Sequence, residues 1–102
     1  MIHLHQQTPI LLATQPVDFR KGIDGFVALV RDVLARHPRC GHYFVFINRE
    51  RSRLRVLSYD GTGYWLMTKR LSKGKFIGWP RQGEVVTSLQ ATQVRTILLG
   101  QP

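Results

Sequence analysis

The middle of the chain alternates short apolar runs with turn residues, and this alternation restricts the fold more than any other feature. Residues 43–47 are dense in β-branched and aromatic side chains, and residues 48–52 separate them from a second such run at 53–59. Two runs of this kind joined by a short polar connection are typical of a β-hairpin. The turn sequence at 60–63 leads into a third run that ends at residue 71. We therefore predict three or four antiparallel strands.

Two further segments extend this sheet. The apolar run Pro9–Ala13 predicts a short strand that holds one edge of the sheet, and residues 84–89 predict one more strand. Another turn, at residues 72–75, leads into the run that ends at Pro80.

An amphipathic helix is predicted between the first strand and the hairpin. Apolar residues recur at helical spacing over 23–34, and polar residues fall between them. Asp18 and Asp24 are alternative N-caps, because either side-chain oxygen can accept a backbone N–H. A proline and a glycine after the basic last turn predict that the helix ends near residue 37.

The length and composition fit one domain. A chain of 102 residues is long enough for a single hydrophobic core, and 43% hydrophobic residues with 10% aromatics are ordinary for a folded protein. Helical spacing of apolar residues within 91–99 predicts a short C-terminal helix. The predicted fold is therefore a single α+β domain over residues 1–102, with a mostly antiparallel sheet packed against the amphipathic helix.

Cysteine usage and hydropathy predict the compartment. Cys40 is the only cysteine, which excludes an internal disulfide framework, and the first residues lack the charged leader of a secretory signal. No apolar run approaches the roughly 20 residues that span a bilayer. We expect a cytoplasmic protein that does not enter the membrane.

The charge of the chain favours a polyanionic partner. Fifteen lysines and arginines against six acids give a net charge of +9, and eight of the basic residues fall between Asn48 and Pro80. Such a concentration of charge recruits nucleic acid, although a merely solvated surface is the alternative. Strand alternation places Arg53 and Arg55 on one face. The residues predicted to contact DNA are Arg20, Lys21, Asn48, Arg49, Arg51, Arg53, Arg55, Lys69, Arg70, Lys73 and Lys75.

Aromatic residues accompany these cations and have two possible roles. They either stack on unpaired bases or fill the core. We expect Trp65 and Trp79 to pack against the face of the helix formed by Phe26 and Val30. The aromatic residues considered for stacking are Tyr59, Tyr64, Trp65, Phe76 and Trp79.

Metal and catalytic sites are weakly supported. His37, Cys40 and His42 are crowded together, but a structural zinc site normally needs four ligands. The acids have local roles as caps, turn residues or solvated side chains, which leaves no carboxylate cluster for magnesium. We therefore predict no cofactor, no metal and no enzymatic activity.

Four motifs in order carry a family resemblance. They are PVDFRKGIDG at 16–25, FVFINR at 44–49, DGTGYWL at 60–66 and KRLSKGKF followed by WP at 69–80. The chain resembles, over roughly residues 10–80, the accessory protein of the insertion-sequence-sixty-six family of bacterial transposable elements, the TnpB-type, Orf-two-like protein. The link at 37–41 departs from the family pattern. The resemblance implies an accessory role beside a separate, larger transposase.

Two functions are consistent with these features. The first is a non-catalytic accessory factor in transposition that binds DNA through a basic strand and loop surface. The alternative is a protein-interaction module that binds the transposase of the element without contacting DNA. On the first reading, changing Arg49, Arg51, Arg53 and Arg55 together to alanine weakens DNA binding and leaves folding nearly intact.

Overall fold

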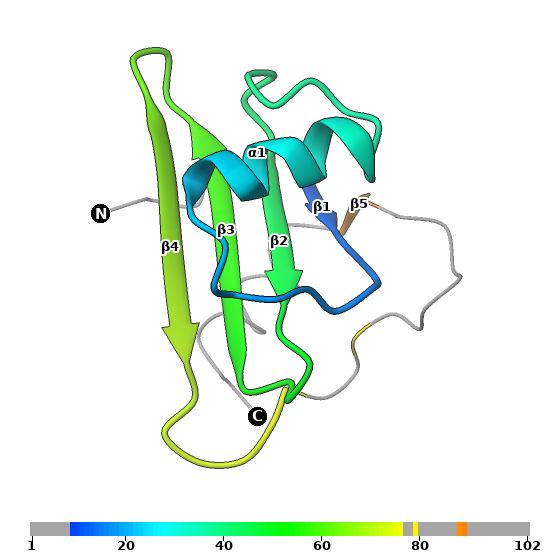
Figure 1. The fold of residues 1–102 in the computed structure, drawn as a ribbon, viewed down its shortest axis with the longest axis vertical. Helices are drawn as coiled ribbons and strands as arrows, with labels where there is room; N and C mark the ends of the chain where they lie inside the picture. The colour runs from blue at the N-terminus through cyan, green and yellow to red at the C-terminus, as the bar shows by residue number, and fades with distance from the viewer. Residues whose placement is uncertain (1–8, 77–78, 80–87, 90–102) are drawn as a thin grey trace.

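The computed structural model describes residues 9–76, 79 and 88–89, and these form one mixed sheet with one helix (Figure 1). The hairpin predicted from the apolar runs is confirmed, with its five-residue connection, and so is the four-residue turn that follows it. In chain order the elements are β1 (Ile10–Leu12), α1 (Ile23–Asp32), β2 (Tyr43–Ile47), β3 (Arg53–Tyr59), β4 (Tyr64–Arg70) and β5 (Ser88–Leu89).

The strands lie in the order β4-β3-β2-β1-β5. The predicted antiparallel meander forms β2, β3 and β4, while β1 runs parallel to β2 and antiparallel to β5. The prediction that the first strand holds an edge is wrong, because β1 is paired on both sides. A parallel pair needs a long crossover, and α1 with its flanking loops provides it.

The faces of the sheet are packed against different parts of the chain. The face that α1 covers carries a cluster built around Phe26 and Val30 of the helix, together with Leu11, Phe44, Phe46 and Leu57. The opposite face carries a second cluster, which includes Ile10, Leu12, Tyr43, Val45, Ile47, Leu54, Val56, Phe76 and Trp79. Since β2 contributes to both clusters, all five of its residues are buried.

The tryptophans do not pack against the helix, so that prediction is wrong. Strand pairing explains the position of Trp65. Leu66 lies opposite Leu57 on the face that the helix covers, so the adjacent Trp65, which lies opposite Ser58, points to the other face. Trp65 remains 44% exposed. Trp79 belongs to the cluster on the far face, where its indole N–H donates a 3.0 Å hydrogen bond to the carbonyl of Ala13.

The start of α1 also differs from the prediction. Gly22 is the N-cap residue, and no side chain caps the helix. Asp18 instead accepts hydrogen bonds from the backbone and side chain of Arg20, and Asp24 lies in the first turn. An acid in the first turn favours the helix through its dipole without capping it.

The end of α1 comes five residues earlier than predicted. Ala35 adopts a left-handed conformation with φ of 54°, which a continuing helix does not allow. The amide of Leu34 bonds to the carbonyl of Leu29, and the amide of Arg36 bonds to that of Val30. The chain therefore turns away at Val33, which is 62% exposed although its spacing predicted a core position.

The predicted C-terminal helix over 91–99 and most of the run at 84–89 lie outside the described residues. Only Ser88 and Leu89 of that run are described, and they form the short strand β5. Within the described residues, no helix is long and apolar enough to cross a membrane.

Candidate nucleic-acid interface

Basic residues gather at one end of the sheet, where β2 and β4 finish and β3 begins (Figure 1). They come from the β2–β3 loop, from the first residue of β3, and from the end of β4 with the loop that follows it. The amide of Leu71 donates a 2.9 Å hydrogen bond to the carbonyl of Ser52, and the amide of Phe76 donates a 2.8 Å hydrogen bond to that of Arg51. These bonds hold the loop after β4 against the β2–β3 loop. We call the cations gathered there the basic end: Arg49, Arg51, Arg53, Arg70, Lys73 and Lys75.

Asn48 shapes the loop of the basic end. Its side-chain oxygen accepts hydrogen bonds of 3.0 Å from the amides of Ser52 and Arg53, and its Nδ2 donates to the Ser52 hydroxyl. The side chain is buried, and Arg51 completes the turn with a φ of 59°. Because both ends of the Asn48 carboxamide are engaged inside the protein, it has a structural role that sequence reasoning did not assign to it.

Arg53 and Arg70 lie directly opposite each other on the helix-covered face of β3 and β4. The adjacent pair, Ser52 and Leu71, is hydrogen-bonded. Hydrogen-bonded and non-hydrogen-bonded pairs alternate along an antiparallel ladder. Arg53 and Arg70 therefore form a non-hydrogen-bonded pair, whose Cα atoms are about 4.5 Å apart. Both side chains are exposed, and neither forms an ion pair with a carboxylate of the described residues.

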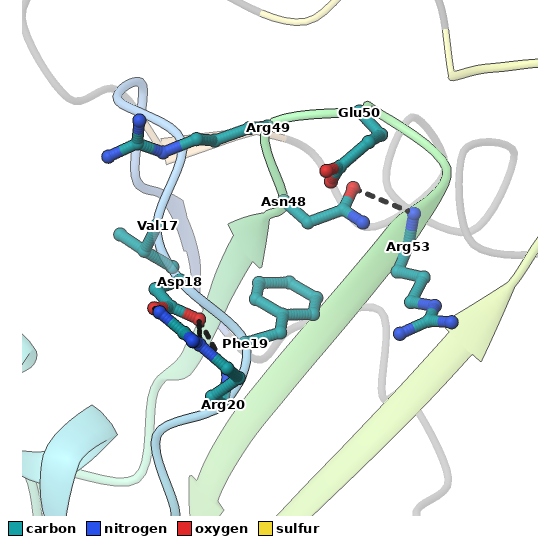
Figure 2. A pocket seen from close by; sticks show the side chains of 8 residues that line it. All are labelled: Val17, Asp18, Phe19, Arg20, Asn48, Arg49, Glu50 and Arg53. Carbon is teal, nitrogen blue, oxygen red and sulfur yellow. Dashed lines mark hydrogen bonds and ion pairs between the residues drawn. The ribbon is translucent and has the colours of Figure 1, made fainter.

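A groove of about 570 Å³ opens beside Arg53, between the segment that precedes α1 and the β2–β3 loop. Figure 2 shows the ring of Phe19 between the two segments, with Arg49 extended over Val17 and Arg53 on the other side. Eight residues line the groove: Val17, Asp18, Phe19, Arg20, Asn48, Arg49, Glu50 and Arg53.

The charge of Arg20 is partly compensated within this groove. Its guanidinium donates hydrogen bonds to Asp18, the shortest 2.7 Å long, and its amide donates another of 2.9 Å. These bonds lower the pKa of Asp18 to about 2, and the carboxylate in turn raises the pKa of Arg20. Arg20 is therefore a weaker candidate for phosphate contact than Arg49 or Arg53.

Arg55 is built into the fold. Its Nη1 group donates hydrogen bonds of 2.7 and 3.0 Å to the carbonyls of Phe19 and Lys21, and its Nε donates one of 2.8 Å to the hydroxyl of Thr68. The guanidinium also lies over the rings of Phe19 and Phe26. The prediction that Arg53 and Arg55 share a face is confirmed, but the Nε and Nη1 donors of Arg55 are engaged within the protein.

Two other predicted contacts lie apart from the basic end. Lys69 is half-buried on the face opposite α1, where it is paired with Leu54. Lys21 is exposed near the start of α1, where its side chain lies in the space that a β-carbon at position 25 would need. The structure therefore divides the predicted cations into four groups: the basic end, Arg20 paired with Asp18, the fixed Arg55 and these outlying lysines.

Asp60 organises the turn at the other end of β3 and β4. Its Oδ1 accepts hydrogen bonds from the amides of Thr62 and Gly63 and from the Thr62 hydroxyl, and its Oδ2 accepts a 2.7 Å bond from the indole of Trp65. The hydrogen bonds lower the pKa of Asp60 well below its ordinary value. The motif DGTGYW is thus explained by a turn and an anchored indole.

The link at 37–42 shows no metal cluster. No group of three or more histidine, cysteine, aspartate or glutamate side chains within the described residues is placed to hold an ion. The ring of His37 accepts a hydrogen bond from the amide of Arg39, Cys40 is exposed, and the Nδ1 atom of His42 is buried without a described partner.

Sequence reasoning missed an aromatic cluster that includes Arg39. Its guanidinium lies 5.1 Å from the ring centre of Tyr59, which packs edge-on against Tyr64. A hydrogen bond with Tyr64 raises the pKa of Arg39. These tyrosines are already in contact with protein groups, and Phe76 and Trp79 are buried. Of the aromatic residues considered for base stacking, Trp65 is the most exposed.

The sequence matches a family model described as "IS66 Orf2 like protein" over residues 8–102. It is 53% identical over 68 residues to the uncharacterized protein y4jC of Sinorhizobium fredii; the match covers 67% of this chain and 58% of that relative. It is also 34% identical over 100 residues to the uncharacterized protein y4hO of the same organism, covering 98% of this chain and 86% of the relative. No solved structure matches.

Proposed function

This chain belongs to the family of IS66 Orf2 like proteins, and we propose that it is a non-catalytic accessory factor in transposition that binds DNA through its basic end. The family itself associates the chain with an insertion sequence. The placement of the cations supports binding to DNA as its mode of action.

The pairing of Arg53 with Arg70 is the observation that carries the proposal. Like charges directly opposite each other destabilise a sheet, and the described residues place no carboxylate between them. Proteins tend to break such local rules where function requires it. A polyanion at this end would remove the repulsion, and a phosphodiester backbone is a polyanion that matches arginine geometry.

The same geometry favours contacts to phosphates over contacts to bases. The exposed cations of the basic end lie on loops and strand ends, and Asn48, the side chain best suited to read adenine, is committed to its own loop. Phosphate contacts fix the position of a protein on DNA without reading sequence. We therefore expect affinity for DNA with little dependence on base sequence.

An accessory role also implies a second protein. We propose that a separate transposase supplies the strand-transfer chemistry and that this protein helps to assemble it on the ends of the element. No cofactor is needed for that role. The alternative, in which the basic end meets an acidic patch of the transposase, requires no DNA contact.

Salt dependence of binding separates these alternatives. Fluorescence anisotropy of the full chain with labelled duplex DNA, titrated across salt concentrations, should give a log–log slope of about −4 to −5 if most of the six cations contact phosphates. A terminal-repeat duplex and a scrambled duplex should bind alike. Absence of binding at 50 mM salt would refute the DNA proposal.

A further inference from the structure

In the part of the chain that the structure describes, strand β4 forms one edge of the sheet. It is the outermost strand in the order β4-β3-β2-β1-β5, so within the described part of the chain only β3 pairs with it (Figure 1). Its seven residues, Tyr64–Arg70, contain neither proline nor glycine and pair with β3 in an unbroken register. Such a regular edge presents a row of backbone donors and acceptors to another strand.

The register with β3 identifies which backbone groups face outward. The amide of Asp60 bonds to the carbonyl of Gly63 at one end of the pair, and the amide of Leu71 bonds to that of Ser52 at the other. Hydrogen-bonded and non-hydrogen-bonded pairs alternate between these ends. The N–H and C=O groups that point away from β3 are therefore those of Tyr64, Leu66, Thr68 and Arg70.

These outward groups restrict how a second β4 can pair with the first. In an antiparallel two-fold arrangement, outward-facing residues must lie opposite outward-facing residues, which allows centres at Leu66, Met67 or Thr68 among the central positions. Centring on Met67 uses all seven residues of both strands. That register places Leu66 opposite Thr68 and each Met67 opposite its copy.

The Met67-centred register is also the one with complementary side chains. It sets Arg70 of one copy opposite Tyr64 of the other, and Lys69 opposite Trp65. Both are cation–aromatic pairs, in which the positive charge is attracted to the face of the ring. The registers centred on Leu66 and Thr68 each pair only five residues of β4. The first leaves both cations outside the paired segment, and the second leaves both aromatic rings outside it. A parallel alignment in register would set cation against cation, which is unfavourable.

Trp65, one of the two aromatic residues in these pairs, is already fixed in position within each copy. The indole N–H of Trp65 is fixed by the 2.7 Å hydrogen bond to Asp60, while 44% of the residue stays exposed. We propose that β4 pairs with β4 of a second copy of this chain, forming a two-fold dimer centred on Met67 with one continuous sheet. The antiparallel arrangement carries the two basic ends away from the axis in opposite directions, which limits repulsion between two highly charged chains.

Cysteine cross-linking tests both the dimer and its register. In a Cys40→Ser background, single cysteines are placed at 66, 67 and 68, and the full-length variants are oxidised with oxidised glutathione in the absence of DNA. Facing residues at Met67 have Cα atoms about 4.5 Å apart, within the range of a disulfide, whereas residues 66 and 68 are offset from their own copies by about 7–8 Å. Met67→Cys should cross-link at least ten times faster than Leu66→Cys or Thr68→Cys.

Sedimentation of the unmodified chain without DNA gives a second, independent test of the dimer. A dimer is expected at tens of micromolar protein, and Lys69→Glu should return it to monomer by placing an acid beside Trp65. Thr62→Cys, in the exposed turn, is the control for random collision. A monomer at every concentration, or equal cross-linking of Met67→Cys and Thr62→Cys, would overturn the proposal and leave the test of DNA binding unaffected.

Discussion

The guanidinium of Arg55 donates a 2.7 Å hydrogen bond to the carbonyl of Phe19 and lies 5.0 Å from the centre of the Phe19 ring. Arg55 therefore ties β3 to the segment that leads into α1. Arg53, two residues earlier on the same face of β3, also carries a guanidinium, but it lies exposed at the basic end. One arginine of this strand face supports the fold, and the other is available to a ligand.

Arg55→Ala should destabilise the protein. The change removes charged donors from two backbone carbonyls and one hydroxyl, together with a stacking contact, and we expect a loss of about 2–3 kcal/mol in the free energy of unfolding. Urea denaturation followed by circular dichroism measures this. Arg53→Ala is the matched control and should stay within about 0.5 kcal/mol of the wild type.

The quadruple change of Arg49, Arg51, Arg53 and Arg55 is consequently a poor test of DNA binding. Sequence alone predicted that it leaves folding nearly intact, but the contacts of Arg55 show why it should not. A triple change that keeps Arg55 separates stability from binding. Equal stability of Arg55→Ala and Arg53→Ala would contradict this assignment.

Phe46→Ala should be among the most destabilising single changes. The ring is 1% exposed and packs edge-on against Phe26 at a centroid distance of 5.0 Å, so truncation leaves a cavity between the sheet and α1. Such changes cost about 3–5 kcal/mol. Thermal and urea unfolding measure the loss, and Val33→Ala, at the exposed C-cap of the same helix, should change stability little.

Asp60 should make stability depend on acid pH. Hydrogen bonds hold the pKa of its carboxyl below the ordinary value of 3.8, so its contribution is fully present above that value and is lost as pH falls toward the lower folded-state pKa. Asp60→Asn should lower stability at pH 7 and flatten the loss between pH 5 and pH 2 compared with the wild type. Parallel stability curves for the two proteins would contradict this.

Arg51→Gly should weaken DNA binding without lowering the stability of the fold. Arg51 has a φ of 59°, a left-handed conformation that costs a non-glycine residue about 1–2 kcal/mol and costs glycine almost nothing. The variant should therefore match or exceed the wild type in stability while binding DNA more weakly. Denaturant midpoints and anisotropy titrations measured on the same sample give both values.

The sequence predicts the local elements well because their signals are local. The alternation at 53–59, the turn at 60–63 and the helical spacing after residue 23 each specify a structure within a few residues. The parallel position of β1 was missed because pairing between distant segments leaves no local pattern. The early end of α1 depends on the left-handed Ala35, which no residue preference indicates.

The candidate site was only partly predictable for the same reason. Charge density along the chain identified the cations, but it did not separate Arg55, which contacts residues 34 to 36 positions away, from Arg53, which is exposed. The opposition of Arg53 and Arg70 depends on the register of two strands. Alternation also could not decide which face α1 covers, so Trp65 and Trp79 were assigned to the wrong face.

The most direct test of the central claim compares two variants of equal charge. Arg53→Gln with Arg70→Gln removes two charges from the basic end, and Arg31→Gln with Arg36→Gln removes two from the exposed part of α1 and the turn after it, so both lower the net charge from +9 to +7. DNA affinity, measured by anisotropy at 100 mM salt, should fall about 10- to 100-fold for the first variant and less than about threefold for the second. Equal losses would show that net charge alone attracts the DNA and would contradict a site at the basic end.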